Sequence, residues 1–413
     1  MTEPTSPSTS NMNDLSVVDG LRMQKSNSLM TVKPKSISFT VFILWLIVQA
    51  VLFYKNGVST VGEAETYIFE AKHLVAGRSL SSASYFLYLT QISLLTFALK
   101  SGIGYWFVAA VQLLFNLIAT FAFYKLATHF FSTKVAIACI VLFLINYPLQ
   151  ELNFYLQTES LFFSFSIIYT AYLLQLSRLT LLHFFIILFS LALICVTRPT
   201  GLLFIPATFL YLFFGFLKTI STPLKLVAVV AISVVFLFVL NAALGSGGGL
   251  DFMLPFLDER IICGVPTLDH NVNIKTASNG NSVYGLLYYI THNFQQFIRL
   301  ALLRSQAFFG LLRTYFGIGH NIFLASFFYP FYVFTLLSIR WWLKNNLYPF
   351  LYLLSLILFT LGTTMLTCDD WHNRWFLSIS PWLIFLSLPT INKLFTIFTA
   401  YGGKRNIQQS DLQ

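Results

Sequence analysis

Acidic and basic side chains of the kinds that carry out group transfer stand in the polar gaps of an otherwise apolar chain. Glu63 and Glu65 lie two positions apart in the segment 62–67, although the chain has only 15 acidic residues. A carboxylate can serve as a general base toward a hydroxyl group. Arg198 and Arg374 occupy later gaps, and a guanidinium group can bind two phosphate oxygens at once. These residues indicate displacement of a phosphate leaving group by a hydroxyl group, with Glu63 or Glu65 as the base.

A second acidic group falls late in the chain, at Asp369 and Asp370, and His372 follows it. Carboxylates and imidazoles are common metal ligands, so a divalent cation could bind here. The chain has no His-Glu-x-x-His motif, and the group by itself is a weak ligand set. We therefore predict no metal-ligating residues, and solvated loop acids with a surface histidine are the alternative interpretation.

The composition places these residues in an integral membrane protein. Hydrophobic residues make up 57% of the chain and charged residues 10%, whereas soluble domains contain about 45–50% apolar residues. The beginning of the chain is polar and lacks an apolar run, so we expect a disordered cytoplasmic tail over 1–35 and no cleaved signal. The net charge is +10, but the Lys and Arg residues are scattered between apolar runs, which argues against nucleic-acid binding.

Apolar runs predict the helices that cross the membrane. About eleven candidates occur along the chain, at 36–54, 85–99, 105–124, 135–147, 159–177, 180–197, 200–217, 224–243, 321–338, 347–366 and 375–391. Clusters of Lys and Arg mark the cytoplasmic side. With these clusters inside, the segments from 105 onward alternate and both termini are cytoplasmic.

Segment 85–99 then cannot cross. Its fifteen or so residues reach only about 22 Å, against a hydrocarbon core of about 30 Å. We predict a re-entrant or interfacial helix there and about ten true crossings. The alternative is an oblique crossing that leaves one basic loop outside.

The predicted fold is an all-α polytopic membrane protein with a bundle of about ten to eleven transmembrane helices. The membrane domain covers 36–398, and a cytoplasmic tail follows at 399–413. A first outer loop at 55–84, a long outer loop at 244–320 and three short outer pieces hold most of the unusual polar residues. These are Glu63, Glu65, Glu70, Glu151, Glu159, Arg198, Asp369, Asp370, His372 and Arg374. A transport path would instead place charges at several depths, so we expect a site that works at the outer face.

Two segments of these loops have helical patterns. Residues 64–76 carry apolar side chains at helical spacing, among them Ile68, Ala71 and Val75, and Gly77 follows as a stop. The pattern predicts a short amphipathic helix at the outer interface, with Glu63 at its N-terminus. Segment 296–316 has arginines at positions 299, 304 and 313 among apolar residues, and we expect these to contact the phosphates of membrane lipids or of a polyprenyl phosphate.

Cysteines and tryptophans add two smaller predictions. Cys263 and Cys368 could form a disulfide if both face an oxidising compartment. Trp341, Trp342 and Trp371 fit aromatic anchors at the membrane interface.

Four short motifs, spread over the membrane part, carry a resemblance to a known family. They are Gly62-Glu63-x-x-x-Tyr67, Tyr155-Leu156-Gln157-Thr158-Glu159, Thr197-Arg198-Pro199-Thr200-Gly201 and His372-Asn373-Arg374-Trp375. In this order they resemble the GT-C superfamily of glycosyltransferases, which use lipid-phosphate sugars and include protein O-mannosyltransferases and lipid A aminoarabinose transferases. In that family an acidic residue four positions before the Tyr, commonly Asp, is taken as the catalytic base. The resemblance therefore gives this role to Glu63 and not to Glu65, with Glu in place of the usual Asp.

The resemblance implies a GT-C-type transferase for a hexose or pentose, with inversion at the sugar. The donor would be a polyprenyl-phosphate sugar, and the acceptor a glycan, lipid or protein on the outer side of a bacterial plasma membrane. Glu63 is the expected catalytic residue, and the expected substrate-binding residues are Glu65, Tyr67, Glu159, Arg198, Asp369, Asp370, His372 and Arg374. A lipid-linked-sugar flippase or transporter without chemistry is the alternative. A polymerase or ligase of lipid-linked glycans is a third possibility, although it typically has a larger late outer loop.

Overall fold

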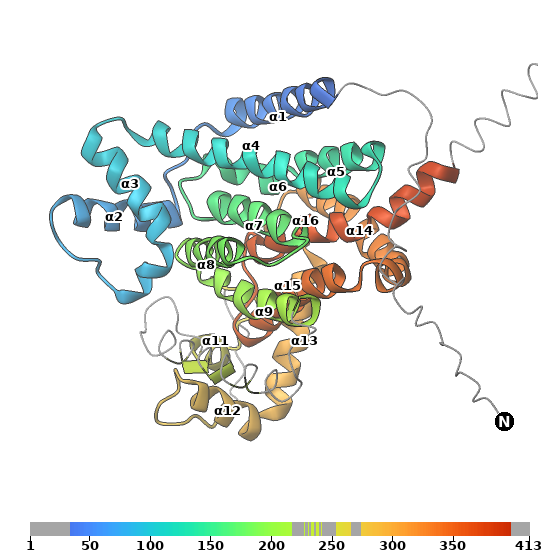
Figure 1. Cartoon of the computed structure of the whole chain (residues 1–413). Coiled ribbons are helices and arrows are strands. Elements are labelled where there is room, and N and C mark those ends of the chain that lie inside the picture. The colour runs from blue at the N-terminus through green and yellow to red at the C-terminus, as the bar shows by residue number, and fades with distance from the viewer. Residues whose placement is uncertain are drawn as a thin grey trace, which may run out of the picture.

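The structure is a computed structural model, and it describes residues 34–216, 253–265 and 274–397, with a few single positions between 227 and 241. Its regular elements are helices (Figure 1). Within these residues, β pairing is limited to two isolated bridges, one between Ser59 and Tyr155 and one between Ile262 and Asp369. The predicted all-α class is confirmed. The predicted segment 224–243 and nearly all of both tails lie outside the described residues.

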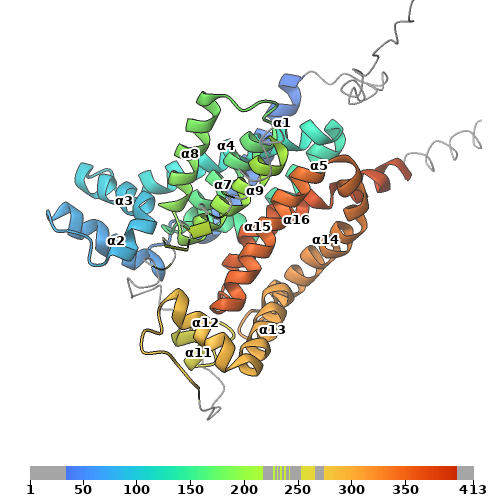
Figure 2. The same ribbon diagram turned by 60° about the horizontal axis from the view of Figure 1, so that its bottom comes forward.

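Helices of very different lengths make up the bundle (Figure 2). In the first half of the chain they are α1 (Pro34–Asn56), α2 (Glu63–Val75), η2 (Ala83–Tyr88), α3 (Leu89–Ser101), α4 (Tyr105–Phe130), α5 (Thr133–Ile145), α6 (Tyr147–Gln150), η3 (Glu151–Phe154), α7 (Glu159–Leu174), α8 (Leu181–Cys195), η4 (Pro199–Leu203) and α9 (Phe204–Gly215). In the second half they are α11 (Leu254–Leu257), α12 (Val283–His292), α13 (Phe294–Gly310), α14 (Ile318–Asn345), α15 (Leu347–Leu366) and α16 (Arg374–Leu386).

Several of the described helices suit a membrane. Four are long and apolar enough to cross one, and they are Phe39–Asn56 of α1, α4, α14 and α15. Two bent pairs, Thr133–Ile145 with Tyr147–Phe154 and Arg374–Leu386 with Leu388–Ile397, raise this number to six if each pair is one span. Helices α7 and α8 and the segment Pro199–Gly215 are apolar but shorter. These helices show an all-α chain of multi-pass membrane character.

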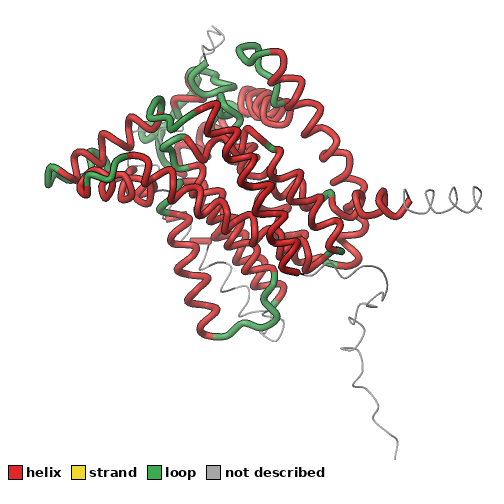
Figure 3. Tube along the Cα trace, turned by 90° about the horizontal axis from the view of Figure 1, so that it is seen from above, coloured by secondary structure: helices red, strands yellow, loops and turns green. Residues whose placement is uncertain are grey.

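The main core lies inside this bundle, where α4 packs against α7 and α15 packs against α9 and α13. Helices lie side by side in the view from above, with loops joining their ends (Figure 3). Trp342 is fully buried in this core, and its indole N–H donates to the carbonyl of Leu386 at 2.8 Å. The predicted interfacial role of Trp342 is therefore wrong, because its ring packs among core aromatic residues such as Phe130 and Phe385.

A second, smaller core joins α2 to α3 at one end of the bundle (Figure 1). The predicted amphipathic helix is confirmed as α2, which buries Ala64, Tyr67, Ile68 and Ala71. Val75 is exposed, unlike the prediction. Glycines close both ends, since Gly62 and Gly77 have φ of 70° and 74°, a left-handed conformation that costs other residues more.

Segment 85–99 folds as the end of η2 and most of α3. Helix α3 has 13 residues, or roughly 20 Å, which is too short to cross a hydrocarbon core directly. It packs on α2, and its backbone is tied to the segment before Arg198, because the Thr90 N–H donates to the carbonyl of Val196 at 3.1 Å. Its re-entrant or interfacial placement stays a prediction.

Gly201 lets η4 approach α8 closely, and this approach gives a test of the fold. A Cβ at position 201 would lie 2.4 Å from the carbonyl oxygen of Ile194, whereas a Cβ at Gly215 would meet nothing within 4 Å. We expect Gly201→Ala to destabilise the protein by roughly 1–3 kcal/mol, because the backbone must shift. Gly215→Ala is the matched control and should leave the melting temperature in detergent unchanged. Equal melting temperatures for the two variants would contradict this packing.

Candidate active site

Arg374, the first residue of α16, binds carboxylates from three separate parts of the chain. Its Nη2 lies 2.5 Å from Glu63 Oε1 and 2.7 Å from Asp370 Oδ2. Its Nη1 donates to Glu159 Oε1 at 2.7 Å, and its Nε donates to Asp370 Oδ1 at 3.0 Å. The guanidinium group therefore joins the start of α2, the start of α7 and the loop before α16.

Glu159 is shared between two arginines. Its side chain is fully buried, and Oε1 accepts from Arg198 Nη1 as well as from Arg374. Arg198 follows α8 and its side chain is 12% exposed, whereas that of Arg374 is 6% exposed. Because a buried carboxylate without a partner is very costly, two guanidinium groups at this position hold the three chain segments together.

Backbone hydrogen bonds bring these segments into place before the side chains meet. The Ser59 N–H donates to the carbonyl of Phe154 at 2.8 Å, and the Leu156 N–H donates to the carbonyl of Ser59 at 3.1 Å. This joins the stretch that leads to Glu63 to the stretch that leads to Glu159. Gln112 of α4 fastens the second stretch, because its side-chain amide donates to the carbonyls of Tyr155 and Gln157, each at 3.0 Å.

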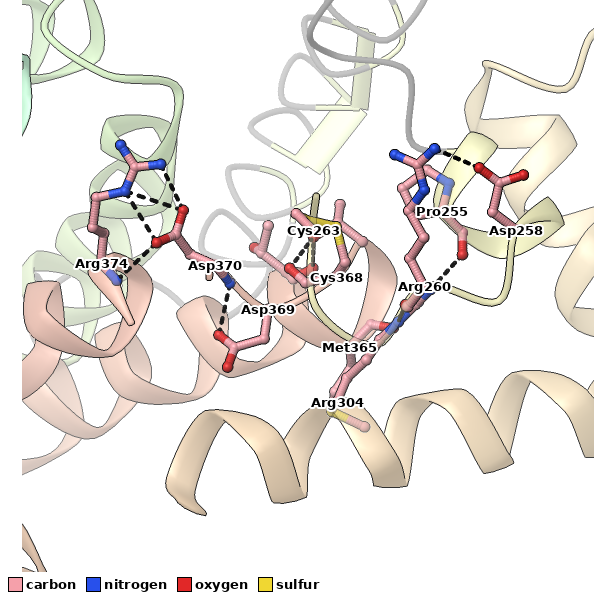
Figure 4. Close-up of a disulfide and its surroundings, with 12 residues drawn as sticks. Pro255, Asp258, Arg260, Cys263, Arg304, Met365, Cys368, Asp369, Asp370 and Arg374 are labelled. Atoms are coloured by element: carbon pink, nitrogen blue, oxygen red, sulfur yellow. Dashed lines mark hydrogen bonds and ion pairs between the residues drawn. A yellow bond between two sulfur atoms is a disulfide. The ribbon is translucent and has the colours of Figure 1, made fainter. Parts of the chain in front are cut away.

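A disulfide holds the third stretch (Figure 4). Cys263 and Cys368 are bonded, with Cα atoms 5.4 Å apart, and the predicted pairing is confirmed. Next to it, the Cys263 N–H donates to the carbonyl of Asp369 and the Asp369 N–H donates to the carbonyl of Ile261, both at 2.8 Å. The segment 261–263 thus fixes the backbone on which Asp370 and Arg374 stand.

The two neighbouring aspartates have different partners. Asp370 faces Arg374 and also accepts the backbone N–H of His372 at 2.9 Å. Burial alone would raise the pKa of Asp370, but the positive charge of Arg374 outweighs it and holds the pKa below its usual value. Asp369 turns away and pairs with the buried Arg313. Burial raises the pKa of Asp369 to about 7, although Arg313 opposes this shift.

A cavity of about 460 Å³ opens beside Arg374. Its charged lining consists of Glu63, Arg198, Asp370 and Arg374, and most of the remaining wall is aromatic or hydroxylated. These other lining residues are Thr66, Tyr67, Ser84, Tyr85, Tyr88, Cys263, Gly264, Trp371 and Trp375. Pockets of about 300–1,000 Å³ commonly bind small molecules. The cavity therefore combines two carboxylates, two cations and aromatic surfaces.

The structure brings together most of the predicted site residues. Glu63, Tyr67, Arg198, Asp370 and Arg374 line the cavity, with Glu159 buried beneath the arginines. The hydroxyl group of Tyr67 donates to Glu63 Oε2 over a long 3.5 Å.

Three predicted residues lie elsewhere. Glu65 is exposed on α2 and does not line the cavity, because α2 turns this position toward the outside. Asp369 is committed to Arg313. His372 is an exposed residue, and its ring lies against Trp371, at 3.9 Å between ring centroids. Among the described residues, no three His, Cys, Asp or Glu side chains come together as a possible metal site.

The arginines expected to contact lipid phosphates have protein partners instead. Arg304 is fully buried and donates to three backbone carbonyls, those of Arg260, Met365 and Pro255, at 2.9–3.0 Å (Figure 4). Arg313 is buried against Asp369, and Arg299 pairs with Glu259 at 2.7 Å. The predicted lipid contacts are therefore wrong for Arg304 and Arg313, which serve as internal braces.

Sequence reasoning also missed several residues of this region. Gln112 is a polar residue inside a long apolar run. Such a residue needs a hydrogen-bond partner when it is buried, so the sequence does contain a signal for it. Tyr85 and Tyr88 give no comparable signal in a chain with 45 Phe and 20 Tyr residues. Their place in the cavity follows from the fold.

Comparisons with known proteins do not add to this assignment. No protein-family model, curated protein or solved structure matches the chain. The geometry of the site must therefore carry the functional argument.

The cysteine pairing gives a direct test of the frame around the site. We expect alkylation of the denatured, unreduced protein to label two cysteines, Cys139 and Cys195, and alkylation after reduction to label all four. Mass spectrometry of the intact protein purified from membranes measures the label count. In Cys263→Ser, the unpaired Cys368 should add a third label without reduction. Four labels on the unreduced native protein would contradict the disulfide.

Proposed function

We propose that the protein transfers a sugar from a polyprenyl-phosphate carrier to a hydroxyl acceptor at the outer face of the membrane. The observation that carries this proposal is the cavity at one end of the helix bundle, where the exposed carboxylate of Glu63 stands beside Arg198 and Arg374. A base, cations for a phosphate and an adjoining apolar bundle are the parts that this reaction needs. Their convergence from distant parts of the chain supports the proposal more than any single motif does.

In the proposed reaction, Glu63 takes the proton from the acceptor hydroxyl group. The acceptor oxygen forms a bond to the anomeric carbon of the sugar while the bond from that carbon to the phosphate oxygen breaks, so the configuration inverts. The electron pair leaves with the polyprenyl phosphate, whose negative charge Arg198 and Arg374 stabilise. Aromatic rings such as Tyr88 and Trp375, which line the cavity, offer flat apolar faces for the sugar ring.

The membrane arrangement belongs to the same proposal. The four long helices, the two bent pairs and the three shorter apolar helices would supply nine of the ten crossings that the basic clusters predict. The fold would then be of the GT-C type, with α2 covering the cavity. The disulfide supports an outer location for the site, because such bonds persist in oxidising compartments. We infer a bacterial plasma membrane with the cavity facing outward.

The carboxylates of α2 provide the test. We expect Glu63→Gln to lose transfer by at least about a hundredfold, because an amide cannot accept the proton. Glu65→Gln is the matched control: it removes the same charge from the same helix, but outside the cavity, and should retain activity. The assay offers membranes a radiolabelled polyprenyl-phosphate sugar and follows label in the acceptor fraction. Normal transfer by a correctly inserted Glu63→Gln variant would refute the base assignment. Movement of intact donor across the membrane without transfer would favour a flippase instead.

A further inference from the structure

We propose that the phosphate of the donor takes the place of Glu63 on Arg374, so that Glu63 is released to act as a base only when the donor is bound. This inference rests on the proposed function and concerns the order of events in the same cavity. It is carried by the way in which the two arginines distribute their hydrogen bonds.

Arg374 has no vacant nitrogen. Its Nε donates to Asp370, its Nη1 donates to Glu159 and its Nη2 contacts both Glu63 and Asp370. The second N–H of Nη1 contacts the amide oxygen of the buried Gln157 at 3.5 Å, and Gln157 does not line the cavity. Since a guanidinium group has five N–H donors in a fixed planar fork, a phosphate that enters through the cavity reaches this arginine by replacing one of the carboxylates.

The three carboxylates differ in how firmly they are held. Glu159 is fully buried and also bound by Arg198. Asp370 is 7% exposed and accepts two backbone N–H groups, those of His372 and Arg374, at 2.9 and 3.2 Å. Glu63 is 45% exposed, and its second contact is the long one from Tyr67. Water can replace the contacts of Glu63 but not those of the other two, so Glu63 is the carboxylate that exchanges.

Arg198 provides a second anchor for the entering phosphate. Its Nη1 binds Glu159 and also donates to the hydroxyl oxygen of Thr158 over a long 3.4 Å. Its Nε and Nη2 have no hydrogen-bond partner among the described residues, although the side chain lines the cavity. A phosphate can therefore bind the free edge of Arg198 first and then the position on Arg374 that Glu63 vacates.

The charge of the cavity favours the same exchange. Three carboxylates and two guanidinium groups meet there, which leaves one net negative charge. A phosphodiester adds a second negative charge next to Glu63, and like charges at contact distance repel strongly in a partly buried site. If Glu63 turns toward the open cavity, this repulsion falls and its carboxylate becomes free for the acceptor hydroxyl. Donor binding would thus precede activation of the base.

Binding of a lipid phosphate, the part that the donor shares with the leaving group, tests the exchange without any transfer step. The full chain is purified in detergent, and isothermal titration calorimetry measures its affinity for farnesyl phosphate, with inorganic phosphate as a second probe for the headgroup alone. We expect Glu63→Gln to bind farnesyl phosphate more tightly than the wild type, on the order of 5- to 10-fold, because the competing carboxylate is gone. Glu63→Ala should do the same. Glu65→Gln controls for the loss of one negative charge on α2 and should bind as the wild type does.

The outcomes separate the exchange from the proposed function. We expect Arg198→Gln to weaken binding of farnesyl phosphate, and this result would place the phosphate in this cavity. If Arg198→Gln weakens binding but Glu63→Gln and Glu63→Ala bind no more tightly than the wild type, the exchange is wrong and the phosphate site stands. If the wild type, Glu63→Gln and Glu63→Ala all fail to bind either probe, the proposed function and the exchange both fall. A monodisperse elution profile and an unchanged melting temperature establish that each variant is folded.

Discussion

The buried carboxylate of Glu159 is the constraint on which the site depends. It lies at the start of α7 with no access to solvent, and both Arg198 and Arg374 bind the same oxygen. Removing such a charge from water costs several kcal/mol unless hydrogen-bonded cations compensate it. Arg198 follows the end of α8, whereas Glu159 begins α7 and Arg374 begins α16, so compensation requires that these three helix termini meet. The cluster of Glu159 with its two arginines thus specifies how these helix termini are arranged, rather than adding to the stability of the fold.

The remaining contacts show how that arrangement is reached. Three pairs of chain segments are joined by backbone hydrogen bonds near the cavity, at Ser59 with 154–156, at Thr90 with Val196, and at Asp369 with 261–263. Each pair positions backbone that leads to charged residues of the site. The disulfide adds a covalent link to the last of them. Irregular backbone of this kind is tolerated only where its polar groups have hydrogen-bond partners. Here the two segments of each pair provide these partners for one another.

The sequence predicts the components of the site better than their partners. Polar motifs between apolar runs identify Glu63, Glu159, Arg198 and Arg374, because charge is rare in this chain, and helical spacing identifies α2 because its period is local. Pairing is not local. Glu63 and Arg374 are 311 positions apart in the sequence, and nothing near either residue indicates that they pair. An arginine that binds three carboxylates therefore looks the same in the sequence as an arginine that is free to bind phosphate.

The same limit explains the errors. Arg304 and Arg313 among apolar residues fit a helix on a lipid surface, yet three carbonyls and Asp369 hold them inside. Glu65 has the same type as Glu63 and lies only two positions away, but two positions along a helix turn a side chain by about 200°. The side chain of Glu65 points away from the cavity because of the helical geometry of α2. Which of the two glutamates faces the cavity depends on where that helix begins, and Gly62 fixes this position.

The carboxylates around Arg374 differ in exposure, and this difference separates those that maintain the architecture from the one that can react. Glu159 and Asp370 are buried and held by partners besides Arg374, so their charges maintain the architecture. Glu63 is nearly half exposed and lies in the first turn of α2, where the helix dipole favours an anion whether or not Arg374 is bound to it. Its charge therefore stays stable when the contact breaks. A carboxylate that can leave its cation without being stranded in an apolar environment is the one member of the cluster suited to move during a reaction.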